Sequence, residues 1–233
     1  MAEFRAVLFD FDDTLVDSLP ARVAAMRQAF TAAQIASPTA EEFYRTVHGG
    51  DFIAAVSDLE QSLGKDLGLL EMYRQRYWNK EPGEIRLHPG VRDLLERLSS
   101  QGTLLAVVTS KGRAVPVVNG RGGGASYEMR ELQIDHFFRA LIGLEDVTRL
   151  KPDPEGILMA LDRLGVEPSN ALYVGDAPAD MAAATAAGVR SCWATWGTLP
   201  DGEMTPAPDF VTRQPAEVLD LLGFGTGAPI ALS

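Results

Sequence analysis

The sequence predicts an α/β fold in which a Rossmann-like, doubly wound parallel sheet is interrupted by an all-helical insert. Three short apolar runs, at residues 6–9, 105–108 and 171–174, are each followed directly by polar residues. Runs of this length are typical of strands buried in a parallel sheet. Between the first two runs, apolar residues recur at helical spacing, which indicates helices rather than further strands.

The first predicted strand ends in the acidic sequence Asp10-Phe11-Asp12-Asp13-Thr14. Open α/β sheets bind ligands just beyond the carboxyl ends of their strands, so these acids lie where chemistry is expected. In an extended segment Asp10 and Asp12 point the same way, and two carboxylates that face one site repel each other unless a cation or a shared proton compensates them. The pattern therefore indicates a metal site. Asp13 suits a turn or a supporting role rather than a metal ligand.

The predicted helical insert runs from about residue 19 to residue 77. Its two apolar faces consist of Val23, Met26 and Phe30 on one helix and Phe52, Val56, Leu59 and Leu63 on another. Asp17 and Ser18 precede the first helix and suit helix capping. Glycines interrupt the helical pattern after Arg45 and His48, so these two side chains either face a ligand or belong to a simple connecting turn.

The remaining strands end in groups that could complete a phosphoryl-transfer site. Thr109 and Ser110 follow the second apolar run and offer hydroxyl groups to phosphate oxygens. Asp176 and Asp180 follow the third run. Lys151 precedes prolines that open a helix near residue 155, which holds the lysine beside the helix N-terminus. Carboxylate oxygens favour Mg²⁺, which also binds waters and substrate phosphate.

These four segments, in this order, resemble the haloacid dehalogenase superfamily, in its phosphatase branch with a helical cap. Residues 10–14 match the DxDxT motif, Thr109 the hydroxyl motif, Lys151 the lysine motif and residues 175–180 the GDxxxD motif. The resemblance implies that the insert is a cap that closes over the core site. The expected catalytic core is then residues 1–16 and 83–233, and the expected cap is residues 17–82.

The resemblance also implies a mechanism. Asp10 would attack phosphorus and form an aspartyl-phosphate, and Asp12 would protonate the leaving oxygen and later activate water. Mg²⁺ would be held by Asp10, Asp176 and the backbone carbonyl of Asp12, with Asp180 positioning the metal or its waters.

The substrate implied by the resemblance is a small-molecule phosphate monoester. Thr109, Ser110 and Lys151 would bind the phosphoryl oxygens. Arg45 and His48, on the cap, would contact the leaving group, and an arginine suits a carboxylate, so phosphoglycolate is a candidate substrate.

Other classes share parts of this pattern. A phosphomutase similar to β-phosphoglucomutase needs the same acids and differs in how its cap excludes water. A receiver-type signalling domain also combines acids, a threonine and a lysine around Mg²⁺. It fits less well, because here the candidate acceptor ends the first strand and a helical insert follows.

One segment departs from the family pattern. Residues 112–126, including the glycine-rich stretch 119–126, contain a proline and several glycines where an amphipathic helix is expected. Both residue types disfavour helices, so we expect an irregular insertion or a short linker there. Helical character resumes near residue 127, and a strand is expected at residues 140–142.

Composition limits the partners. The net charge of −11 disfavours nucleic acid and anionic membranes. Cys192 is the single cysteine and lies in an apolar run, so we expect a buried thiol in a reducing cytoplasm. No apolar run approaches the ~18 residues of a membrane span, and we expect a monomer that acts on a small-molecule phosphate ester.

Overall fold

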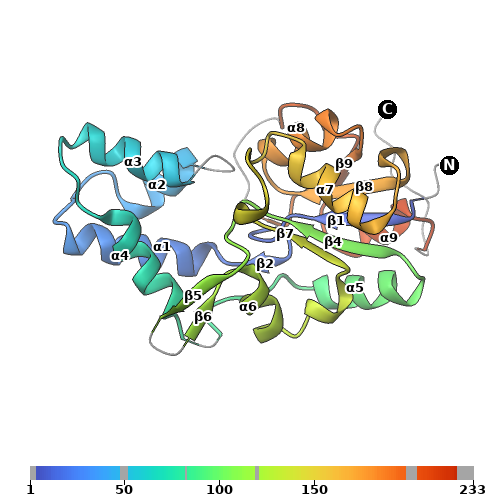
Figure 1. Cartoon of the computed structure of the whole chain (residues 1–233), viewed down its shortest axis with the longest axis horizontal. Helices are drawn as coiled ribbons and strands as arrows, with labels where there is room; N and C mark the ends of the chain where they lie inside the picture. The colour runs from blue at the N-terminus through green and yellow to red at the C-terminus, as the bar shows by residue number, and fades with distance from the viewer. Residues whose placement is uncertain (1–3, 48–51, 82, 119–120, 198–203, 225–233) are drawn as a thin grey trace.

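A parallel sheet forms the centre of the molecule (Figure 1). The computed structural model describes residues 4–47, 52–81, 83–118, 121–197 and 204–224, without the side chains of residues 115–122. Within these residues the sheet has six strands in the order β10-β9-β8-β1-β4-β7. In chain order the strands are β1 (Ala6–Phe9), β4 (Leu104–Val108), β7 (Ala140–Ile142), β8 (Ala171–Gly175), β9 (Arg190–Ala194) and β10 (Phe210–Thr212).

The order of the strands makes the sheet doubly wound. From β1 the chain adds β4 and then β7 on one side, and afterwards adds β8, β9 and β10 on the other side. The direction of winding therefore reverses between β1 and β8. Doubly wound sheets bind their ligands at this point of reversal, beyond the carboxyl ends of the strands. The predicted fold class is confirmed.

Successive side chains of a strand point to opposite faces of the sheet, and a layer of helices packs on each face. Val7 and Phe9 of β1 belong to the core cluster that also includes residues of α5, α6 and α9, whereas Ala6 and Leu8 pack with α7 and α8. Period-two alternation is the reason one apolar run can serve both layers. The helices of the two layers are α5 (Val91–Ser100), α6 (Ala125–Glu131), α7 (Glu155–Leu164), α8 (Pro178–Ala186) and α9 (Glu217–Leu221). Short 3₁₀ turns occupy η1 (Asp135–Phe137), η2 (Leu144–Asp146) and η3 (Pro168–Asn170).

Four helices among the described residues lie between β1 and β4 and form the helical cap, at the left of Figure 1. They are α1 (Leu19–Ala32), α2 (Ala40–Val47), α3 (Phe52–Ser62) and α4 (Leu69–Trp78). Met26 and Phe30 are buried, as their predicted face requires, and Val56 is buried on α3. Leu63 is 37% exposed because α3 ends one residue before it, so the predicted second face is shorter than expected.

The two chain segments that enter and leave the cap are paired. β2 (Val16–Asp17) and β3 (Arg86–Leu87) form an antiparallel ribbon in which Val16 lies opposite Leu87. The expected capping roles of Asp17 and Ser18 are wrong. Asp17 lies in this ribbon and its carboxylate binds Arg86, while the Ser18 hydroxyl donates to Asp12 Oδ1 at 2.6 Å and makes no capping bond.

The glycine-rich segment is also different from the expected irregular insertion. It forms a two-stranded antiparallel hairpin, β5 (Val115–Val118) and β6 (Arg121–Gly123), beside α4 (Figure 1). A Cβ atom on Gly123 would lie 2.8 Å from ring atoms of Trp78. The glycine therefore lets the hairpin approach the last residue of α4 closely, a reason for glycine that composition alone cannot reveal.

Two smaller expectations concern Cys192 and membrane spans. Cys192 is buried and its sulfur lies 3.2 Å from Thr212 Oγ1, and burial raises the pKa of the thiol to about 12, as suits a structural cysteine. None of the helices in the described ranges combines the length and apolar character that a membrane crossing requires.

Candidate active site

The site is built at the carboxyl ends of three adjacent strands. Asp10 follows β1, Thr109 follows β4 and Asp176 follows β8, and all three are buried. The register of β1 with both neighbours aligns these ends, since Phe9 lies opposite Val107 on one side and Val174 on the other. Residues far apart in the chain therefore meet where the sheet reverses its winding.

Three carboxylates lie together, and one ammonium group binds two of them. Oxygen atoms of Asp10, Asp176 and Asp180 all lie within 4.8 Å of one another. Lys151 Nζ donates to Asp10 Oδ1 at 2.7 Å and to Asp180 Oδ1 at 2.6 Å. With every group ionised, three negative charges face one positive charge, which leaves two negative charges uncompensated. This charge and the oxygen ligands suit a divalent cation such as Mg²⁺.

The pKa values of the cluster favour a neighbouring cation. Burial raises the pKa of Asp10 to about 7, although Lys151 opposes the rise. Burial also raises the pKa of Asp176, and the neighbouring acids Asp13 and Asp180 add to the effect. The ionised carboxylates are thus costly here unless a cation joins them.

Asp180 is fixed at the start of α8. Its Oδ2 accepts the Ala177 N–H at 3.0 Å, and the Tyr173 hydroxyl lies 3.2 Å from its Oδ1. A Cβ atom on Gly175 would lie 2.5 Å from the Asp180 side chain, so only glycine leaves room for the carboxylate to fold back against β8. Asp180 is therefore a helix cap, and the same carboxylate binds Lys151.

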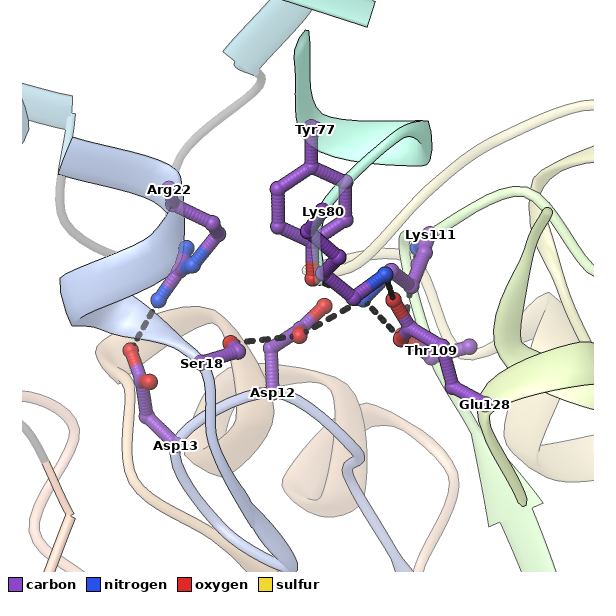
Figure 2. Close-up of polar contacts among 9 residues, drawn as sticks. All are labelled: Asp12, Asp13, Ser18, Arg22, Tyr77, Lys80, Thr109, Lys111 and Glu128. Atoms are coloured by element: carbon purple, nitrogen blue, oxygen red, sulfur yellow. Dashed lines mark hydrogen bonds and ion pairs between the residues drawn. The ribbon is translucent and has the colours of Figure 1, made fainter. Parts of the chain in front are cut away.

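Asp12 occupies a second cluster, toward the cap (Figure 2). Its Oδ1 accepts hydrogen bonds from Ser18 Oγ at 2.6 Å and from Lys111 Nζ at 2.9 Å. Its Oδ2 has no hydrogen-bond partner within the described part of the chain. Burial by itself would raise the pKa of Asp12, but Lys111 and Arg22 bring the pKa down to about 2. One oxygen is thus anchored and the other is available to a ligand.

Lys111 connects Asp12 to the cap. Besides Asp12, its ammonium donates to the Tyr77 hydroxyl at 2.9 Å and to Glu128 Oε2 at 2.5 Å. The second oxygen of Glu128 accepts from Lys80 Nζ at 2.6 Å. Tyr77 lies in α4 and Lys80 follows it, so cap and core share these contacts (Figure 2).

Comparison with known proteins assigns the family. The family model described as haloacid dehalogenase-like hydrolase matches residues 7–194. The chain belongs to this family. The hydrolase is 32% identical over 224 residues to an N-acetylmuramic acid 6-phosphate phosphatase of Pseudomonas aeruginosa, covering 94% of each chain. It is 32% identical over 214 residues to a phosphoglycolate phosphatase of Xylella fastidiosa, covering 91% of this chain and 90% of the relative.

Solved structures are similar over the same extent. A haloacid dehalogenase-like family hydrolase from Streptococcus pneumoniae superposes with a TM-score of 0.76 and 27% identity, covering 95% of this chain and 99% of the other. The similarity thus includes the cap as well as the sheet.

The hydrolase brings together most of the site residues expected from the sequence. Asp10, Lys151, Asp176 and Asp180 form the first cluster, and Asp12 lies beside it in the second. Thr109 is buried at the end of β4, where its hydroxyl accepts the Lys111 N–H at 3.1 Å.

Two of the other expected residues lie at the surface. Ser110 is exposed, and Arg45 is exposed on α2. His48 lies outside the described residues. Arg22 of α1 does reach the acid loop, where it pairs with Asp13.

Sequence reasoning gave no role to several other polar residues of the site. Thr14 donates to Asp176 Oδ1 at 2.9 Å and so fixes a candidate metal ligand. Lys111 stands two residues after Thr109, a spacing that could have drawn attention to it. Glu128 and Lys80 carry no comparable signal, because they meet only through the packing of the hairpin segment against the end of α4.

Proposed function

We propose that this hydrolase is a Mg²⁺-dependent phosphatase that hydrolyses a small-molecule phosphate monoester through an aspartyl-phosphate on Asp10. The observation that supports it best is the cluster of Asp10, Asp176 and Asp180 around Lys151 at the reversal point of the sheet. A nucleophilic carboxylate beside further carboxylates and a lysine is suited to a phosphate group whose charge a divalent cation offsets.

The residues present fit a Mg²⁺ ion. Asp10, Asp176 and the backbone carbonyl of Asp12 would hold it, with Asp180 positioning the ion or its waters. When bound, the ion supplies positive charge that reduces the repulsion between the Asp10 carboxylate and the phosphate dianion. The two uncompensated negative charges of the cluster support a divalent rather than a monovalent ion.

The chain's own residues would carry the reaction in two steps. Asp10 attacks phosphorus, the bond to the leaving oxygen breaks, and Asp12 Oδ2 gives that oxygen a proton. Asp12 takes up this proton as the anionic phosphate binds and offsets the effect of Lys111 and Arg22 on the pKa of Asp12. Asp12 then takes a proton from the water that attacks the aspartyl-phosphate, which releases inorganic phosphate and restores Asp10. Lys151 and Thr109 bind the phosphoryl oxygens and hold the phosphorus between the attacking oxygen of Asp10 and the leaving oxygen.

We propose core boundaries at residues 1–16 and 83–233 and a cap of residues 17–82. The support is the antiparallel β2–β3 ribbon, which pairs residues 16–17 with residues 86–87, close to these boundaries. We further propose that the protein is a cytoplasmic monomer, in keeping with its single buried cysteine.

The proposed substrate class is a small phosphorylated carboxylic acid, with phosphoglycolate as the first candidate. The two relatives are named for phosphoglycolate and for a phosphorylated muramic acid. Assay of phosphate release from a panel of phosphorylated metabolites tests the proposal. We expect one such acid to be turned over with higher kcat/KM than p-nitrophenyl phosphate. Phosphoryl transfer to a second hydroxyl without free phosphate would indicate a phosphomutase, and a stable phosphoprotein would indicate a receiver-type domain.

Arg45 provides a test of substrate selection. Arg45→Ala should raise KM for phosphoglycolate and leave hydrolysis of p-nitrophenyl phosphate nearly unchanged, because loss of uniform binding acts on KM and not on the chemical step. Arg74→Ala, an exposed arginine on α4 of the same cap, is the matched control. Equal effects on both substrates, or none on either, would mean that Arg45 does not select the leaving group.

A further inference from the structure

Glu128 is a buried carboxylate outside the motifs of the proposed mechanism. It lies on α6, and its side chain is 0% exposed. Each of its oxygens accepts a hydrogen bond from a different lysine, Oε1 from Lys80 and Oε2 from Lys111. Burial of a carboxylate is costly unless it is paired and fully hydrogen-bonded, and both lysines meet that need here.

The pairing continues to Asp12 (Figure 2). Lys80, Glu128, Lys111 and Asp12 form a chain of alternating charges with two positive and two negative members. The four residues come from four separate segments: the residues after α4, helix α6, the loop after β4 and the loop after β1. Lys80, which follows α4, supplies the second positive charge. The charges therefore balance only when this segment lies against the core.

Lys111 has no freedom left in this arrangement. An ammonium group has three donors, and Asp12, Tyr77 and Glu128 accept one each. Its Nζ also lies 5.2 Å from the centre of the Phe11 ring and 4.9 Å from that of Tyr77. Without the Glu128 charge, one of these three directions would no longer be fixed.

The position of Lys111 determines how Asp12 is presented. Ser18 and Lys111 both bind Oδ1 of Asp12, and in the described residues Oδ2 has no partner. Two donors on one oxygen fix the rotation of the carboxylate and leave the other oxygen available to a ligand. A displacement of Lys111 would remove one of the two anchors.

We propose that Glu128 is a positioning residue for Asp12. It holds Lys111, which orients the Asp12 carboxylate, and it binds Lys80, which makes that orientation depend on the docked cap. This inference rests on the proposed role of Asp12 as the acid that protonates the leaving oxygen. Glu128 itself touches no reacting atom.

The test compares two phosphate esters that differ in their need for an acid. Phenyl phosphate must have its leaving oxygen protonated, whereas 2,4-dinitrophenyl phosphate releases a stable anion without a proton. Release of the phenol in the first turnover isolates the step in which Asp12 acts as an acid. Glu128→Gln should slow this release about tenfold or more for phenyl phosphate, a part of the roughly 10²- to 10⁴-fold effect of a general acid, and about threefold or less for the dinitrophenyl ester.

Two variants complete the experiment. Glu131→Gln, an exposed glutamate on the same helix, is the matched control and should leave both rates unchanged. Glu128→Asp keeps the charge but withdraws it by one carbon. It should show the same selective loss, and it replaces the glutamine variant in the experiment if that variant does not fold. Equal losses on both esters, or no loss, would overturn the positioning role.

Asp12→Asn separates failure of this inference from failure of the proposed function. If Asp12→Asn shows the selective loss and Glu128→Gln does not, Glu128 has no positioning role and the proposed mechanism stands. If Asp12→Asn shows no selective loss, Asp12 is not the acid, and both the mechanism and the inference are wrong.

Discussion

Asp10→Asn is expected to abolish phosphate release almost entirely while the protein remains folded. The amide that replaces the carboxylate is not a nucleophile, so no aspartyl-phosphate can form. The fold should tolerate the change because Asn has nearly the same shape as Asp, and Lys151 keeps its ion pair with Asp180. Phosphate release from p-nitrophenyl phosphate and far-ultraviolet circular dichroism measure the two effects.

Asp162→Asn is the matched control for this variant, since Asp162 is exposed on α7 and should be replaceable without loss. Retention of more than about a tenth of the activity by Asp10→Asn would exclude a mechanism in which Asp10 is the sole nucleophile, because loss of the nucleophile removes the whole covalent route.

Removal of divalent metal should reduce phosphate release about as much as Asp10→Asn does. With every group ionised, the described cluster would carry two uncompensated negative charges, and a phosphate dianion would add two more. Activity should therefore vanish in excess chelator and return with Mg²⁺. Ca²⁺ should substitute poorly, because its larger coordination sphere would displace the nucleophile from its line of attack.

The same account predicts the behaviour of a ligand variant. Asp176→Ala should raise the Mg²⁺ concentration needed for half-maximal activity sharply, whereas Asp162→Ala on the exposed face of α7 should not change it. A titration of activity against Mg²⁺ measures both. Undiminished turnover in excess chelator would contradict the metal-dependent mechanism.

The first cluster could be predicted from the sequence because each of its members is defined locally. Asp10 and Asp176 directly follow apolar strands, and the carboxyl ends of neighbouring parallel strands meet by the rules of the fold. Lys151 and Asp180 stand at helix starts marked by prolines. The structure was needed only to show which segments lie side by side, because the residue types already indicated the chemistry.

The second cluster could not be predicted because its members meet through tertiary packing. Glu128 is 48 residues from Lys80 and 17 from Lys111, and no period or motif connects them. Ser18 suited a helix cap by residue type, yet its hydroxyl binds Asp12, since a charged acceptor offers the stronger hydrogen bond. The pairing of β5 with β6 was hidden by glycines, of which Gly123 allows the close approach to Trp78.

The proposed mechanism requires that Asp10 become phosphorylated. Asp12→Asn should accumulate this intermediate with 2,4-dinitrophenyl phosphate, because the first step then needs no acid while hydrolysis still lacks its base. Mass spectrometry of the acid-quenched protein would locate the added group. We expect one phosphoryl group on the peptide that contains Asp10, and none on that peptide when Asp10 is also replaced by Asn. Continued turnover with no phosphoryl group on Asp10 at any time would contradict it.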